Sequence, residues 1–187
     1  MLTSRFAKAL TYAVQVHAGQ RRKGTNIPYI AHPLAVASVA LEHGASEDEA
    51  IAALLHDAIE DSADPLAVKA EIRRRFGGTV AAIVEGCSDS LALPKPPWRE
   101  RKERYLAHLP EASASIRLVS AADKLHNARA ILADYRQVGE ALWGRFNKRK
   151  DEILWYYRSL ATAFLELGPR PLAEELDRVV TEIERLV

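Results

Sequence analysis

With 187 residues, 48% of them apolar and 27% charged, the chain has the composition of one globular domain with a substantial buried core. Its net charge of +1 argues against a general nucleic-acid binder, and its one cysteine, Cys87, excludes an intramolecular disulfide and fits a reducing compartment. No apolar run approaches the roughly 18–20 residues of a membrane span, and the N-terminus lacks the pattern of a signal peptide, so we expect a cytoplasmic protein without a membrane partner.

A first amphipathic helix is followed by a basic loop. The helix is predicted to begin at the Thr3-Ser4 cap. In the polar loop at 19–31, Arg22 and Lys23 lie beside a glycine. Such a loop can bind a phosphate, and it can equally be a solvated connection with exposed charges.

The next two helices have clear start signals. Pro33 suits the first position of a helix, so His32 lies at or just before the helix start, where it can point into a site or act as a modest cap. Ser46 and Glu49 form a capping box that opens the central helix of the chain.

The central helix, predicted to run to about Ser62, has an unusual polar face. Its apolar first half is followed by four polar side chains within six residues, namely His56, Asp57, Glu60 and Asp61. At about 100° per residue these side chains fall within an arc of roughly 140°. Three like charges so close together repel one another, and a metal ion would relieve that repulsion. From this segment alone, a solvated face of an amphipathic helix remains an equal alternative.

The second half of the chain is also predicted to be helical, with one irregular stretch. Three prolines exclude regular structure at 88–97. The helix that opens at Trp98 alternates in charge, which is typical of a salt-bridged exposed helix or of a basic edge facing an anionic ligand. Further helices are predicted at about 138–167 and 171–186. Because no strand-like alternation occurs, the predicted fold class is all-α.

A second acidic position supports a metal site. Asp123 lies in a mostly apolar segment, where an aspartate is costly unless it is paired or bound to a metal. We therefore predict a ligand set from three separate helices or helix ends, composed of His32, His56, Asp57 and Asp123. Two imidazoles and two carboxylates suit Mn²⁺, Fe²⁺ or Zn²⁺ better than Ca²⁺, and the sequence does not separate these three ions.

The order of these residues resembles that of the HD superfamily of metal-dependent phosphohydrolases. Closer similarity to the hydrolase domain of RelA/SpoT-type stringent-response enzymes is carried by residues 20–24, 28–34, 53–61 and 122–129. The resemblance covers about residues 5–130 and weakens toward the C-terminus. It implies a single HD hydrolase domain over 1–187, an all-α helical bundle with C-terminal helices at 138–187. Since the chain leaves no room for a synthetase domain beside the hydrolase domain, it resembles a stand-alone small alarmone hydrolase.

The resemblance also implies roles for the matched residues. One Mn²⁺ would be held by His32, His56, Asp57 and Asp123. The acidic pair that positions or deprotonates the attacking water would be Glu60 and Asp61. The nucleotide would be contacted by Arg22, Lys23, Asn127 and Arg129. The substrate would be (p)ppGpp, which loses pyrophosphate from its 3′ oxygen, and a homo-oligomer is compatible with the sequence.

Three departures from the family pattern lie near the expected substrate pocket. Ala130 stands where the family often has threonine, residues 87–90 read Cys-Ser-Asp-Ser where threonine followed by lysine is usual, and the proline-rich insert at 91–97 is particular to this chain. They leave open an HD phosphohydrolase acting on another phosphorylated nucleotide, such as NADPH. A nucleotide-binding module without catalysis and a purely structural helical domain are further alternatives, against which the intact acidic pair and ligand positions argue.

Overall fold

The computed structural model describes residues 1–60, 62–92 and 94–187. Its elements in chain order are α1 (Ser4–Val16), α2 (Ala31–Glu42), α3 (Glu47–Leu55), α4 (Pro65–Phe76), α5 (Gly78–Cys87), α6 (Trp98–His108), α7 (Ala114–Val138), the 3₁₀ segment η1 (Gly139–Arg145), α8 (Lys150–Leu167) and α9 (Arg170–Leu186). Among the described residues the only β-type pairing is an isolated bridge between Arg21 and Pro28. The predicted all-α fold class is therefore confirmed. None of the described helices is long and apolar enough to cross a membrane.

The predicted starts of α1 and α3 are present, whereas α2 begins at Ala31, so His32 is its second residue and Pro33 its third. The Thr3 side chain accepts a hydrogen bond from the Arg5 N–H, and Ser46 and Glu49 form a reciprocal capping box at α3. At α4, the Asp64 carboxylate accepts the Ala67 N–H before a proline in the first turn. These caps satisfy N–H groups that a helix leaves unpaired at its start.

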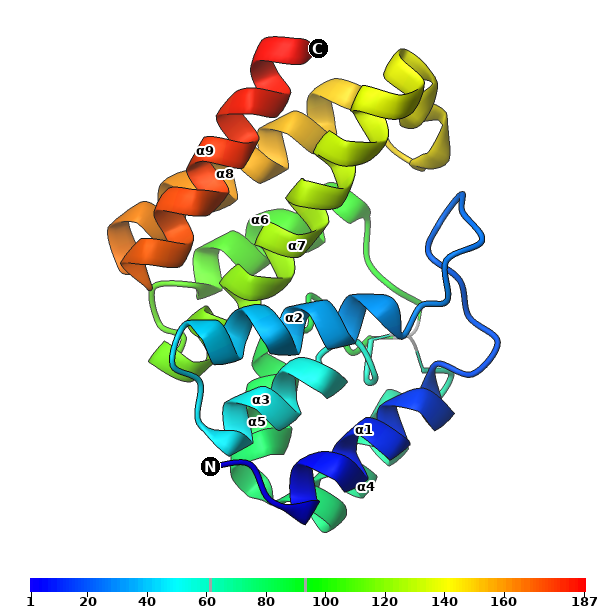
Figure 1. The fold of residues 1–187 in the computed structure, drawn as a ribbon, viewed down its shortest axis with the longest axis vertical. Coiled ribbons are helices and arrows are strands. Elements are labelled where there is room, and N and C mark those ends of the chain that lie inside the picture. Colours follow the sequence, from blue (N-terminus) through cyan, green and yellow to red (C-terminus); the bar gives the residue numbers. More distant parts are fainter. Residues whose placement is uncertain (61, 93) are drawn as a thin grey trace.

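The helices form two packed groups joined by α7. Residues Ala50 to Leu55 of α3 are fully buried, and α3 packs against α1, α2, α5 and α7. The long helix α7 also packs against α8 and α9, which lie on the opposite side of the molecule from α1 and α4 (Figure 1). The middle of α7 is thus where both groups meet, and it carries Asp123.

The central helix is shorter than predicted. It ends at Leu55 rather than near Ser62, and residues 56–60 form turns. The His56 Nδ1 lies 2.8 Å from the Ala53 carbonyl oxygen, which a continuing helix would pair with the N–H of Asp57. The polar side chains after Leu55 therefore do not share one helical face.

The predicted helix at 138–167 is also divided. Helix α7 extends to Val138, η1 follows, and α8 begins only at Lys150. Gly139, with a φ of 57°, provides the left-handed conformation that ends α7.

Candidate metal centre and nucleotide cavity

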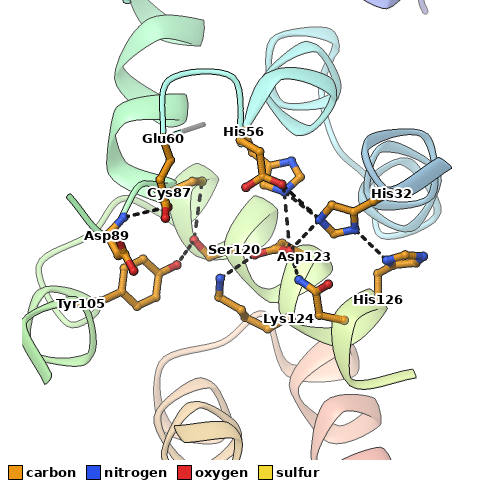
Figure 2. A network of polar contacts seen from close by, with 12 residues as sticks. His32, His56, Glu60, Cys87, Asp89, Tyr105, Ser120, Asp123, Lys124 and His126 are labelled. Atoms are coloured by element: carbon orange, nitrogen blue, oxygen red, sulfur yellow. Dashed lines mark hydrogen bonds and ion pairs between the residues drawn. The ribbon is translucent and has the colours of Figure 1, made fainter. Parts of the chain in front are cut away.

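The structure brings the four predicted ligand residues together. Figure 2 shows His32, His56 and Asp123 converging from three parts of the chain. The Nε2 atom of His32 lies 3.1 Å from His56 Nε2 and 3.1 Å from Asp123 Oδ1. Asp57 Oδ2 lies 3.0 Å from His56 Nε2 and 3.4 Å from His32 Nε2. Two imidazole nitrogens and two carboxylate oxygens thus surround one point. We call His32, His56, Asp57 and Asp123 the ligand cluster.

These separations fit a shared metal ion. Ligand atoms bound at about 2.1 Å lie about 3.0 Å apart in octahedral coordination and about 3.4 Å apart in tetrahedral coordination. The separations between imidazole nitrogens and carboxylate oxygens here are 3.0, 3.1, 3.4 and 3.6 Å. The N/O donor set matches the preference of Mn²⁺, Fe²⁺ and Zn²⁺. The cluster therefore fits a divalent ion of this kind.

The charges in the cluster also favour a cation. Burial disfavours protonated His56, but Asp57 and Asp123 outweigh burial and raise the pKa of this imidazole well above its ordinary value. Burial also opposes ionisation of both carboxyl groups. Their pKa values are nevertheless held well below the usual range by the facing histidines, with Lys124 contributing most at Asp123. Two ionised carboxylates in a buried site are neutralised by a proton on the imidazole or by a metal ion that replaces it.

Surrounding groups contact and orient the predicted ligand residues. His32 Nδ1 lies 2.7 Å from His126 Nδ1, and the Tyr29 hydroxyl donates to Asp57 Oδ2 at 2.6 Å. Burial, followed by the charges of His32 and Arg22, lowers the pKa of His126 to about 4, so the ring is neutral and its Nδ1 can accept a hydrogen bond from the His32 Nδ1–H. With its Nδ1–H so engaged, His32 presents the Nε2 lone pair to the cluster.

The carboxylate of Asp123 divides its contacts between two partners. Its Oδ1 accepts a hydrogen bond from Asn127 Nδ2 at 2.6 Å, and its Oδ2 accepts one from Lys124 Nζ at 2.6 Å. Asn127 Oδ1 in turn accepts from Arg22 Nη2 at 2.7 Å. The basic loop is thereby connected to the ligand cluster through a single amide side chain.

Two cavities of about 220 and 270 Å³ open beside this connection. They share Lys23, Asn127, Phe146 and Tyr157 as lining residues. The smaller cavity is also lined by Arg22, Asp134 and Arg145, and the larger one by Trp98, Lys102, Lys124 and Lys148. The larger cavity therefore combines four lysines with aromatic rings, a composition suited to a phosphorylated aromatic ligand.

The remaining predicted residues lie in different surroundings. Glu60 follows the ligand pair His56-Asp57 on the turn, and its side chain is turned toward Asp89 (Figure 2). Asp61 lies outside the described residues. Arg129 forms an exposed ion pair with Glu175 of α9 and is not among the described residues lining the two cavities. Its assignment as a nucleotide contact rests on the motif alone.

Several residues of the site were not singled out from the sequence. Tyr29 and His126 lie inside the quoted motifs, but nothing in the sequence indicated which ligand each would contact. Lys102 belongs to the charge-alternating helix α6, whose exposed pairs are Arg99 with Glu103 and Arg104 with Glu100. Helix α6 thus forms exposed salt bridges and also contributes Lys102 to the larger cavity, while a role facing an anionic ligand stays a prediction.

Comparison with known proteins agrees with this geometry. The HD-domain family model matches residues 9–152. The guanosine-3′,5′-bis(diphosphate) 3′-pyrophosphohydrolase MESH1 of Xenopus tropicalis is 42% identical over 125 residues, which cover 65% of this chain and 66% of that protein. The Danio rerio protein of the same name is 38% identical over 130 residues, covering 68% and 69%. The alignments thus span about two-thirds of these relatives. The GTP pyrophosphokinase rsh of Brucella abortus is 35% identical over 128 residues, 66% of this chain but 16% of that protein.

Solved structures show the same arrangement of helices. One, described as a metazoan ortholog of SpoT that hydrolyzes ppGpp, superposes with a TM-score of 0.81 at 25% identity and covers 98% of this chain and 97% of its own. The protein lmo0812 of Listeria monocytogenes superposes with a TM-score of 0.71 at 27% identity, covering 82% and 99%. Since the family model matches most of the sequence, this chain belongs to the HD-domain family.

Proposed function

We propose that this protein is a metal-dependent (p)ppGpp 3′-pyrophosphohydrolase, which releases GDP or GTP and pyrophosphate. One observation carries the proposal. The Oδ1 atom of Asp123 faces the ligand cluster, and its Oδ2 atom accepts a hydrogen bond from Lys124. Lys124 in turn lines the larger cavity together with three further lysines. The proposed metal site and a lysine-lined cavity therefore share one wall, which supports a phosphate-cleaving reaction. The relatives named for this reaction support the choice of substrate.

We assign one divalent ion to His32, His56, Asp57 and Asp123. Mn²⁺ is the proposed ion, with Fe²⁺ and Zn²⁺ as the alternatives that the same donors accept. When bound, such an ion lowers the pKa of a water molecule and polarises a phosphoryl oxygen.

The side chains around the ion position the substrate. Arg22, which donates to Asn127, and Lys23 line the smaller cavity. They are placed to neutralise phosphate charge at the side of the ligand cluster where Asn127 lies. Lys102, Lys124 and Lys148 are placed to bind the second diphosphate of the nucleotide in the larger cavity. The aromatic walls of the cavities provide surfaces for the base. We retain Arg129 as a proposed contact on the strength of its motif.

The proposed reaction is a hydrolysis with Glu60 and Asp61 as the acidic pair. The water oxygen forms a bond to the phosphorus attached to the 3′ oxygen, and the bond between that phosphorus and the 3′ oxygen breaks. Glu60 accepts the proton from the water, and the 3′ oxygen gains a proton as the nucleotide leaves. Asp61 is proposed to share the positioning of the water with Glu60.

We also propose that residues 1–187 act as one hydrolase domain. Helices α8 and α9 pack on α7, which carries Asp123, and Tyr157 of α8 lines both cavities. Helix α8 thus contributes to both cavities, and α9 packs on α7 and α8 rather than forming a separate unit.

The test is product analysis with purified protein. The protein is incubated with ppGpp and, separately, with NADPH, with Mn²⁺ or with a chelator. We expect pyrophosphate and GDP from ppGpp, lost on chelation. Phosphate release from NADPH alone would keep the metal site and replace the substrate, and absence of turnover of either nucleotide by the metal-loaded protein would contradict the proposal.

A further inference from the structure

The carboxyl group of Glu60 is contacted at both oxygens by a segment distant in sequence. Its Oε1 lies 3.1 Å from Lys95 Nζ and 3.8 Å from Arg101 Nη1. Its Oε2 accepts the backbone N–H of Asp89 at 3.4 Å. Because Glu60 lies on a turn and not on a helix, its own backbone does little to fix the side chain. The orientation of this carboxylate is therefore set by its partners.

The backbone that carries Lys95 is unusually restricted. Lys95 lies between Pro94 and Pro96, and proline fixes its own φ and disfavours helical conformations at the residue before it. The guanidinium of Arg101 donates from Nε to the Pro96 carbonyl oxygen at 3.2 Å. A lysine on such a backbone loses less conformational entropy when it forms an ion pair than one on a flexible loop.

A buried acid anchors the same segment. The Asp89 carboxylate, 3% exposed, pairs with Arg101 and with Lys102, whose Nζ lies 2.6 Å away. Burial opposes ionisation of Asp89, yet Lys102 and Arg101 lower its pKa from the ordinary value. The network thus extends from Lys102 in the lysine-lined cavity, through Asp89 and Arg101, to Glu60.

We propose that Lys95 is a positioning residue, which holds the Glu60 carboxylate in the orientation needed to accept a proton from the attacking water. The inference rests on the proposed function and on the role assigned there to Glu60. A carboxylate oxygen has two lone-pair sites, so an oxygen bonded to Lys95 or to an amide retains capacity to accept from water. Without Lys95, the Glu60 side chain would sample other rotamers, and fewer molecules would have the reactive geometry.

Two other roles for Lys95 are less consistent with the structure. Lys95 is absent from the described residues that line the two cavities, which argues against a direct contact with the bound nucleotide. An ordinary surface ion pair requires neither an acid on the turn that carries His56 and Asp57 nor a base between two prolines.

The test compares Lys95→Met with Lys95→Arg, which keeps the charge. Arg136→Gln, which breaks an exposed pair with Glu182, is the matched control, because neither residue of this pair lines the two cavities. With ppGpp as substrate, we expect Lys95→Met to lower kcat about tenfold, with KM and bound metal unchanged. Lys95→Arg should restore most of kcat, and Arg136→Gln should resemble wild type. An unchanged kcat in Lys95→Met, or a raised KM as its main effect, would overturn the proposal.

A second measurement is independent of the substrate. Amide hydrogen exchange of the metal-loaded protein reports on the Asp89 N–H that Glu60 Oε2 accepts. We expect faster exchange at Asp89 in Lys95→Met and wild-type exchange in Arg136→Gln. Unchanged exchange would show that Glu60 is held without Lys95 and would overturn the positioning role. If the wild-type protein did not hydrolyse ppGpp, the proposed function would be wrong. Amide exchange at Asp89 would still test whether Lys95 holds Glu60.

Discussion

The ligand cluster and the surroundings of Glu60 are built in different ways. His32, His56 and Asp123 are at most 5% exposed and are held by neighbouring groups on helices or helix ends. Glu60 lies on a turn, and its partners come from the irregular segment that contains Asp89 and Lys95. These three side chains are fixed by burial and hydrogen bonds, whereas Glu60 is fixed by ion pairs that water partly reaches. Metal binding should therefore be robust to changes that reduce catalysis.

The largest effect is expected from removing a ligand. Asp57→Ala deletes the oxygen that lies 3.0 Å from His56 Nε2, so the protein should lose bound metal together with all detectable activity. Metal analysis after gel filtration measures the first effect and pyrophosphate release the second. Asp151→Ala, at an exposed acid paired with Arg149, is the control. Retention of one equivalent of metal by Asp57→Ala would remove Asp57 from the ligand set.

A substitution at Glu60 should separate catalysis from metal binding. Glu60→Gln keeps the size of the side chain but cannot accept the proton, so activity should fall by about 10²–10⁴-fold while the metal content stays that of wild type. Parallel measurement of kcat and bound metal tests this separation. If Glu60→Gln were fully active, Glu60 would have no part in proton transfer.

A smaller effect is expected at a residue that orients a ligand. His126→Ala removes the ring that pairs with His32 Nδ1 at 2.7 Å, so the affinity for the metal should fall by about 10–100-fold. Activity should return when excess metal is added, which distinguishes this variant from Asp57→Ala. A competition titration against a chelating dye measures the affinity, and wild-type affinity would contradict the orienting role.

The smallest effect concerns the stability of the Glu60 region. The lowered pKa of Asp89 in the folded protein means that its ionised form stabilises the fold above the unfolded pKa of about 3.9, and that this contribution disappears as pH falls through the folded pKa. Asp89→Asn should therefore lower the free energy of unfolding by about 2 kcal/mol at pH 7. The difference from wild type should shrink below about pH 4.

Urea unfolding at pH 7 and at lower pH values measures this difference. Asp151→Asn, which alters an exposed acid, should show almost none of it. A difference that persists undiminished at low pH would mean that Asp89 stabilises the protein by packing and not by charge.

The fold and the ligand cluster were largely predictable from the sequence. Helix caps such as Ser46 with Glu49 are local signals, and polar residues in apolar segments, as at Asp123, indicate a buried site whatever the detailed path of the chain. The end of α3 was predicted wrongly because periodicity does not reveal that the His56 side chain contacts the Ala53 carbonyl. Residues 56 and 57 reach the same cluster from a turn.

The environment of Glu60 was not predictable in this way. Asp89 and Lys95 are separated from Glu60 by 29 and 35 residues, and neither lies on a periodic element. Their segment was recognised only as irregular and particular to this chain. Long-range ion pairs between a turn and a loop leave no local pattern, so only the three-dimensional structure shows them.

The most direct measurement of the central claim is a metal titration. Metal-free protein is titrated with Mn²⁺ while pyrophosphate release from ppGpp is followed. We predict that activity rises from zero and saturates at one ion per chain, and that Asp57→Ala stays inactive throughout. Full activity in the metal-free protein, or saturation unaffected by Asp57→Ala, would contradict a reaction centred on the cluster of His32, His56, Asp57 and Asp123.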